Sequence, residues 1–211
     1  MKDSTKSGKF LWVGNDPAID FANTEIVQDG QTVDLLETPE DLLDWMAAAE
    51  MLSSGALKDA KRALRRPQLQ KALTCACEYR RVLKTALENP HQHRHIYADK
   101  AAIAETNRLL ACPRTTFALS TAEKSLQLKH NWVITEPDDL SRPIALAFAR
   151  LLTTQDVGRI RKCQNPDCVL FFLDTSKSGT RAWCSMEICG NKLRVAAFRK
   201  RHESDSAAVT K

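Results

Sequence analysis

The sequence predicts an α+β protein that is mostly α: a helical N-terminal domain with short β-hairpins, followed by a small treble-clef-like zinc finger. Three observations favour this class. Apolar residues recur every three or four positions through much of the chain, stretches of alternating polarity are short, and two cysteine pairs lie near the end. With 211 residues, 43% of them hydrophobic and 27% charged, the chain can form one sizeable core and a small appended module.

The first expected elements are short. Phe10–Val13 is predicted as a strand. Asn15 or Asp16 is expected to cap a helix that has Pro17 in its first turn, so a short helix is expected to run through Thr24. The turn sequence Gln28–Gln31 lies between two β-branched pairs and predicts a tight hairpin.

Five longer helices follow from caps and from helical periodicity. They are expected to begin at Thr38-Pro39, near Ala56, at Pro67, after Asp99 and near Ser141. The fourth is expected to turn Ile103, Thr106, Leu109 and Leu110 inward. Between it and the last helix, residues 116–120 and 126–134 alternate in polarity and predict two strands.

Two cysteine pairs dominate the end of the chain. Cys163 and Cys168, and then Cys184 and Cys189, are each separated by four residues, and fifteen residues lie between the pairs. Tetrahedral zinc is commonly bound by two such local pairs, each supplying two thiolates. We therefore expect one structural Zn²⁺ bound by Cys163, Cys168, Cys184 and Cys189. Four thiolates leave no position for water or substrate, so catalysis by the metal is not expected.

The finger is expected to follow the order of a treble clef. Cys163 and Cys168 would form a knuckle, Val169–Leu173 one strand and Thr180–Cys184 the returning strand. Cys189 would lie at or near the start of a basic helix from about residue 191 to 202. A module of this size buries too little apolar surface to fold alone, so zinc is expected to supply much of its stability.

The same stretch resembles a known family. Cys163-Gln-Asn-Pro-Asp-Cys168, Phe172-Leu-Asp174, Trp183-Cys-Ser-Met186 and Cys189-Gly-Asn-Lys192 are similar to the CGNR-type zinc finger. In that bacterial family the finger follows a mostly helical domain called ABATE, and the members are described as stress-induced transcription regulators. The family's arginine is Lys192 here, which keeps the charge but loses the planar, bidentate guanidinium.

The N-terminal residues carry a second resemblance. Ile19-Asp20-Phe21-Ala22-Asn23-Thr24 is similar to the opening signature of ABATE domains. Its polar residues Asp20, Asn23 and Thr24 are candidates for lining a ligand pocket. The alternative is structural: Asn23 and Thr24 bond the backbone locally and Asp20 anchors a turn.

Charge is distributed unevenly over the expected domains, which are a disordered N-terminus (1–9), the ABATE-like domain (10–157), the finger (158–202) and a flexible tail (203–211). Residues 158–202 hold ten lysines and arginines against three acids, whereas the whole chain has a net charge of +5. Such a module favours a polyanionic partner. We predict DNA contacts from residues of the finger: Lys177, Arg181, Lys192, Arg194, Arg199, Lys200 and Arg201.

The charge and the zinc motif predict DNA binding, and the resemblance implies a transcription regulator whose N-terminal domain senses a small-molecule effector or forms a homodimer. An RNA-binding or protein-docking finger stays open as an alternative, as does an enzyme with its site in the N-terminal domain. No Ser/His/Asp order, phosphate loop or catalytic metal set is recognisable, so no enzyme is expected. Without a secretory signal or a membrane-spanning apolar run, the expected location is cytoplasmic.

Overall fold

The computed structural model describes residues 8–88, 99–111, 115–122, 125–191 and 194–195. Helices dominate these residues: α1 (Pro17–Ala22), α2 (Pro39–Ala48), α3 (Ser54–Ala63), α4 (Arg66–Glu88), α5 (Lys100–Leu110) and α6 (Arg142–Thr154). Antiparallel hairpins are formed by β1 (Glu25–Gln28) with β2 (Gln31–Asp34), β3 (Thr115–Ala122) with β4 (Ser125–Trp132), and β5 (Ile160–Lys162) with β6 (Phe171–Leu173). The predicted α+β, mostly α, class is confirmed.

Local chemistry explains where the helices begin. The Thr38 hydroxyl accepts from the Asp41 N–H at 3.2 Å, and the Asp41 carboxylate accepts from the Thr38 N–H at 2.8 Å, which forms a capping box at α2. Asp16, Ser53 and Asp99 cap α1, α3 and α5 through their side chains. The predicted starts are therefore confirmed, with α3 and α4 beginning one or two residues earlier than expected.

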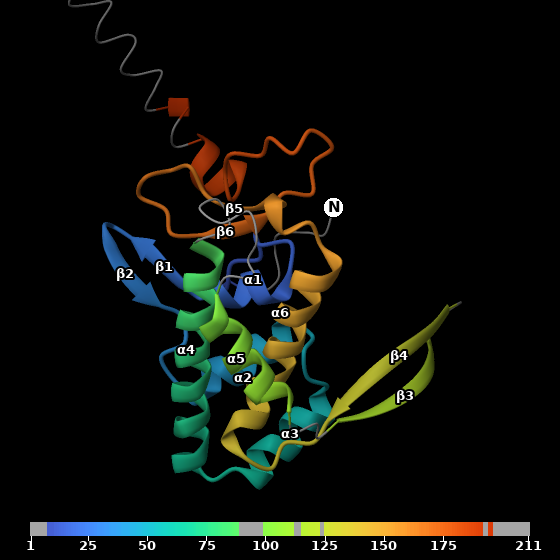
Figure 1. The fold of residues 1–211 in the computed structure, drawn as a ribbon. Helices are drawn as coiled ribbons and strands as arrows, with labels where there is room; N and C mark the ends of the chain where they lie inside the picture. Colours follow the sequence, from blue (N-terminus) through green and yellow to red (C-terminus); the bar gives the residue numbers. More distant parts are fainter. Residues whose placement is uncertain (1–7, 89–98, 112–114, 123–124, 192–193, 196–211) are drawn as a thin grey trace, which may run out of the picture.

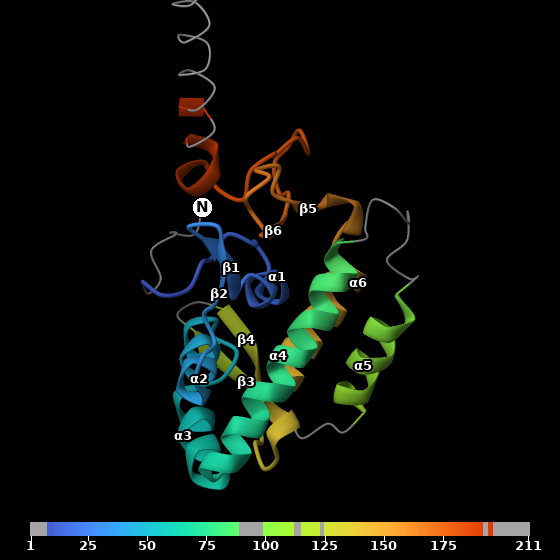
Figure 2. The same cartoon turned by 90° about the vertical axis from the view of Figure 1, so that its left-hand side faces the viewer.

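The helices enclose one core, in which α1 contacts both α4 and α6. In Figure 1, α1 lies in the upper part of the helical body, next to the C-terminal β5/β6 hairpin, and Figure 2 shows the long helix α4 crossing the face of the molecule. Trp45 is fully buried, stacks on Trp12 at a centroid distance of 6.0 Å and meets Phe21 edge-on at 4.9 Å.

The β5/β6 hairpin belongs to this core and also to a second cluster around the cysteines. Ile160, Phe171 and Leu173 are buried among the helices. Phe172, which points to the other face of β6, is buried with Val13 and the four cysteines. Alternate residues of one short strand therefore join the helical part to the finger.

Two predicted strands are wrong. Phe10–Val13 forms no strand, although its side chains alternate: Phe10 and Trp12 pack on the helical core, and Leu11 and Val13 pack on the cysteine cluster. The alternation therefore arises because the segment is buried between the helical core and the cysteine cluster, and not because it forms a hydrogen-bonded ladder.

Thr180–Cys184 also forms no strand, because β6 already has a neighbour on each side. β5 pairs with one edge. On the other edge, the Leu173 N–H donates to the Gly14 carbonyl at 2.8 Å, and Phe171 bonds the Asn23 side chain.

One inward assignment on α5 is also wrong. The buried positions are Ala102, Thr106 and Leu109, which follow the i, i+4, i+7 spacing of a single helical face. Ile103 lies to the side of this face and is 37% exposed.

Candidate metal centre

The four cysteines of the predicted zinc site come together. Cys163, Cys168, Cys184 and Cys189 are all buried, and their Sγ atoms lie within 4.8 Å of one another. The distance from Cys168 Sγ to Cys184 Sγ is 3.9 Å, and that from Cys184 Sγ to Cys189 Sγ is 3.6 Å. Tetrahedral zinc with Zn–S bonds of about 2.3 Å separates its sulfurs by roughly 3.8 Å, so the donor set fits one zinc ion.

The first pair lies in the connection between β5 and β6. Cys163 directly follows β5, and its N–H donates to the Leu170 carbonyl at 2.9 Å, which closes the two ends of the connection. The Cys168 N–H donates to the Asn165 carbonyl at 2.9 Å within the turn. These bonds turn both side chains to the same side, as the predicted knuckle requires.

The second pair lies on a tight helical turn. Ser185 caps the single-turn π-helix Met186–Gly190, and its hydroxyl accepts from the Ile188 N–H at 2.9 Å. The turn carries Cys189, and Cys184 directly precedes the cap. The chain continues in helical conformation at Asn191, Arg194 and Val195.

Two of the sulfurs accept hydrogen bonds from nitrogen donors. Asn165 Nδ2 donates to Cys189 Sγ at 3.3 Å, and the Cys184 N–H donates to Cys163 Sγ at 3.4 Å. Such bonds stabilise thiolate charge and orient metal ligands. Asn165 itself is buried, which a spacer residue in an ordinary surface turn would not need to be.

Three of the clustered thiols also shift one another's pKa values. Hydrogen bonds with the Cys168 and Cys184 thiols lower the pKa of Cys163, and the contacts with Cys163 raise the pKa values of Cys168 and Cys184. The thiols of Cys163, Cys168 and Cys184 therefore share protons instead of ionising together. A bound zinc ion would supply the positive charge that favours thiolates at this site.

The Arg181 side chain makes its contacts within the finger and with the N-terminal segment. Its Nε donates to the Trp183 carbonyl at 2.9 Å, and its Nη2 donates to the Val13 carbonyl at 3.2 Å and to the Cys184 carbonyl. The guanidinium lies 4.2 Å from the centroid of Phe172. Arg181, which the charge pattern placed among the DNA contacts, is therefore a positioning residue for the segment that carries Cys184.

The three polar residues of the N-terminal motif are buried and make internal hydrogen bonds. The Asp20 carboxylate accepts from the Gly14 N–H at 2.7 Å. The Asn23 side chain bonds the Phe171 backbone, and the Thr24 hydroxyl donates to the Phe21 carbonyl while it accepts from Arg80. Because these groups are buried and used structurally, the structural alternative explains the motif. The bonding partner of Asn23 is distant in sequence, however, rather than local.

The remaining predicted DNA contacts divide into two groups. Lys177 and Arg194 are exposed, and neither has an acidic partner among the residues that the structure describes. Lys192, Arg199, Lys200 and Arg201 lie outside the described residues, as does most of the predicted basic helix.

Other basic residues of the finger make internal contacts. Arg159 donates to the carbonyls of Asp174 and Ser176, and Arg161 donates to that of Gly179. Sequence reasoning counted these charges as available to a partner, and it also missed Asn165 and the stacking of Arg181 on Phe172. The Cys-Gln-Asn-Pro turn was the only available signal for Asn165.

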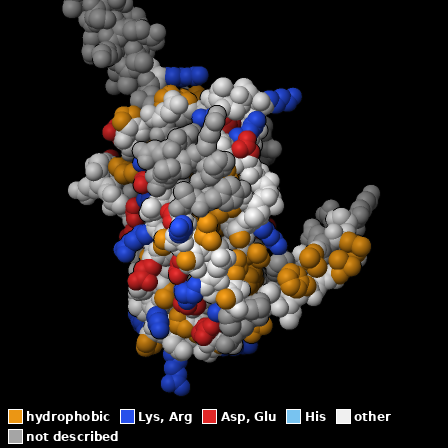
Figure 3. Space-filling view, viewed as in Figure 1, with side chains coloured by type: hydrophobic (Ala, Val, Ile, Leu, Met, Phe, Trp, Pro, Cys, Tyr) orange, Lys and Arg blue, Asp and Glu red, His pale blue; other side chains and the backbone are white. Residues whose placement is uncertain are grey.

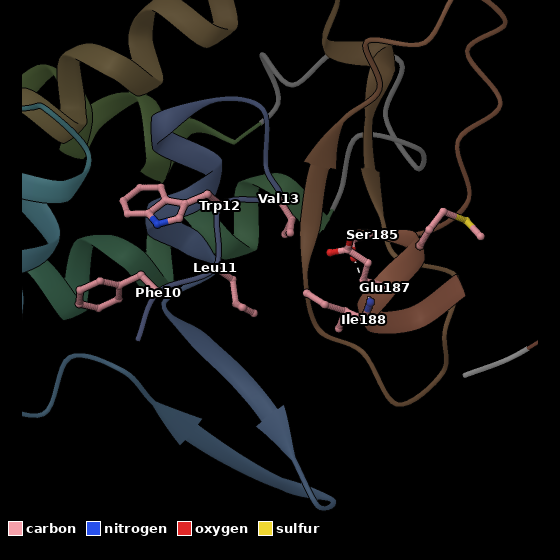
Figure 4. A pocket seen from close by; sticks show the side chains of 8 residues that line it. Phe10, Leu11, Trp12, Val13, Ser185, Glu187 and Ile188 are labelled. Atoms are coloured by element: carbon pink, nitrogen blue, oxygen red, sulfur yellow. Dashed lines mark hydrogen bonds between the residues drawn. The ribbon is translucent and has the colours of Figure 1, made fainter. Parts of the chain in front are cut away.

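A cavity of about 240 Å³ lies between the N-terminal segment and the turn that carries Cys189. Figure 4 shows Leu11 and Val13 directed toward Ser185, Glu187 and Ile188, whereas Phe10 and Trp12 point away into the helical body. This groove offers open space at the junction of the two parts.

Comparison with known families gives two matches. Residues 15–155 match the ABATE family model, described as "Putative stress-induced transcription regulator". Residues 159–202 match the model of the CGNR zinc finger. No curated protein matches the chain. The finger match and the cysteine geometry together identify one structural zinc site, and both resemblances expected from the sequence are confirmed.

Proposed function

This chain belongs to the ABATE family of stress-induced transcription regulators and carries a CGNR zinc finger, and from that premise we propose that it regulates transcription by binding DNA through the finger. The observation that carries the proposal is the position of the cysteine cluster. Cys189 belongs to the buried four-cysteine site and precedes the most basic segment of the sequence, so the site fixes the point from which that segment begins.

The internal contacts of Arg159, Arg161 and Arg181 reduce the charge that is available to DNA. The proposed phosphate contacts are the six remaining candidates: Lys177, Lys192, Arg194, Arg199, Lys200 and Arg201. Each phosphate neutralised on duplex DNA contributes about −0.9 to the slope of log K against log salt concentration. If all six engaged, the slope would be about −5.

We propose a non-catalytic role for both parts. The four sulfurs complete a tetrahedral zinc site, and the polar groups of Asp20, Asn23 and Thr24 are occupied by internal hydrogen bonds. The helical domain would instead sense an effector. The groove between Leu11 and Ile188 is where a small molecule would touch both that domain and the turn bearing Cys189.

The test is a salt titration of binding to duplex DNA of random sequence by the zinc-loaded full chain, followed by fluorescence anisotropy. Replacing Arg199, Lys200 and Arg201 together by alanine should lower the magnitude of the slope by about three and weaken binding to all sequences. The matched control replaces three exposed cations of the α3 region, Lys58, Lys61 and Arg62, which changes the net charge equally.

The proposal fails if the intact protein does not bind duplex DNA at low salt, or if both triple variants lower the slope equally. Parallel titrations with single-stranded RNA, and pull-down of protein partners at matched salt, separate the alternatives. Tighter binding to RNA than to duplex DNA, abolished by the same triple variant, would assign the finger to RNA.

A further inference from the structure

The β3/β4 hairpin carries the four most exposed large apolar side chains among the residues whose side chains the structure describes. Phe117, Leu119, Leu126 and Leu128 are exposed by 58%, 68%, 66% and 61%. Figure 1 shows this hairpin projecting from the helical body, away from the finger, and Figure 3 shows hydrophobic side chains along it.

The strand register places these four residues on one face, here called the apolar face. Leu119 is opposite Leu128, and Phe117 and Leu126 each lie two positions along their strand from that pair. Since side chains two apart point to the same side of a strand, the four are neighbours. The other face carries small or polar residues, such as Thr116 and Ala118.

A hairpin of this kind is unstable when nothing covers it. Two strands alone are marginal in water, and stability requires a further layer against the apolar side. Contiguous exposed apolar surface marks an interaction site on proteins of this size. The apolar face therefore leaves room for an occupant, since Leu119, Leu126 and Leu128 are each more than 60% exposed.

We infer that the occupant is a second copy of this chain, with the two apolar faces packed against each other about a two-fold axis. The scarcity of charged residues in the two strands favours a second copy of the chain as the partner. β3 contains no charged residue; in β4, Lys129 is at the register position opposite Ala118 and His130 at the one opposite Phe117. A patch of four uncharged side chains meets its own copy without repulsion, whereas it offers no ionic contact to a charged protein or to lipid headgroups.

The exposed area agrees with such a dimer. Large apolar side chains present on the order of 200 Å² each when fully exposed, so four that are more than half exposed offer roughly 500 Å². Two facing copies would bury on the order of 1,000 Å², which is the lower end for a specific interface. The inference goes beyond DNA binding and does not depend on it, because the dimer would form in the absence of DNA.

The experiment measures the mass of the zinc-loaded full chain by sedimentation equilibrium across a concentration series without DNA. We expect a monomer–dimer equilibrium. Leu119→Glu places two carboxylates opposite each other and should raise the dimer dissociation constant at least 100-fold. Ala118→Glu, at the adjacent position on the other face, adds the same charge and should change the dimer dissociation constant by less than threefold. Zinc content and circular dichroism verify that both variants fold.

A charge-complementation step distinguishes self-association from other causes. Leu119→Glu and Leu119→Lys should each be monomeric alone and should form a mixed dimer when combined. A wild-type protein that stays monomeric throughout would overturn the inference, as would a dimer that both glutamate variants weaken equally or that neither weakens. So would binding to phosphatidylcholine–phosphatidylglycerol vesicles that Leu119→Glu abolishes in a protein that does not dimerise.

Discussion

Asn23 and Phe171, 148 residues apart in sequence, form a two-way hydrogen-bonded pair. Asn23 Nδ2 donates to the Phe171 carbonyl at 2.9 Å, and Asn23 Oδ1 accepts from the Phe171 N–H at 2.9 Å. The side chain amide thus occupies the edge of β6 as a neighbouring strand would. Because both residues are buried, this pair fastens the helical domain directly to the finger.

Replacing Asn23 by alanine should therefore destabilise the protein by about 2–4 kcal/mol, since it leaves a buried N–H and a buried carbonyl of Phe171 without partners. The measurement is urea unfolding of the zinc-loaded chain. Asn107→Ala is the control, because Asn107 is exposed on α5 and the change should cost less than about 0.5 kcal/mol. Equal stabilities of the two variants would show that the pair contributes nothing.

The helices were predictable from sequence because their signals are local. Thr38-Pro39 and Asp99 are caps that act within one turn, and the periodicity of α4 persists over 23 residues. The cysteine set was predictable for a related reason: metal ligands are few in type, and their spacing within each pair is short.

The joint between the two parts could not be predicted, because it consists of long-range pairs with no sequence pattern of their own. Asn23 meets Phe171, and Gly14 bonds Leu173, only because the fold brings β6 to α1. The same contacts fill the edge of β6 that was assigned to residues 180–184. Likewise, the charge of Arg181 is visible in the sequence, but the three carbonyls that engage it are not.

Zinc removal should destabilise more than the finger, since Phe171 and Leu173 belong to the helical core. With free zinc at about a thousand times its Kd, the bound ion contributes about 4 kcal/mol, and chelation should remove that amount from the free energy of unfolding. Hydrogen exchange should show faster exchange at the Leu173 amide, which bonds Gly14. Unchanged protection there would mean that the helical domain alone holds β6.

Single cysteine variants test the same site without a chelator. Cys184→Ser should bind less than one zinc per chain and should unfold at lower urea. Cys77→Ser is the matched control, because Cys77 is half-buried on α4, far from the cluster, and the chain should keep its zinc. If both variants retained equal zinc, the four-cysteine site would be wrong.

Arg181→Lys should weaken zinc binding by 10- to 100-fold, the usual range when a residue that supports the ligands is changed. Lysine keeps the charge but cannot reach three carbonyls or lie flat over Phe172 as the guanidinium does. Competition with a chromophoric chelator measures the affinity, and Lys177→Arg, an exposed change in the same loop, serves as the control. At saturating zinc the DNA affinity should be close to that of the wild type. Reduced DNA binding with unchanged zinc affinity would show that Arg181 contacts DNA directly.

The carboxyl of Asp20 should make stability depend on pH. Burial raises the pKa of Asp20 to about 7, with a further contribution from the nearby charge of Asp16 and in spite of the hydrogen bond from the Gly14 N–H. The unfolded chain releases this proton near pH 4. Between these two pH values the folded protein holds the extra proton, so its free energy of unfolding should fall as pH rises, by on the order of 4 kcal/mol by pH 8.

Asp20→Asn removes this dependence and still offers an oxygen to the Gly14 N–H. In urea unfolding at a series of pH values, the free energy of unfolding of the variant should rise relative to that of the wild type from pH 4 to pH 7. The difference should be constant above pH 8, where Asp20 is ionised in both the folded and the unfolded wild type. The control is Asp44→Asn, which makes the same chemical change on the exposed side of α2. Parallel curves of unfolding free energy against pH for the wild type and Asp20→Asn would mean that the Asp20 carboxyl is ionised in the folded protein over the whole pH range. In that case, the joint between α1 and β6 would include a buried negative charge at every pH tested.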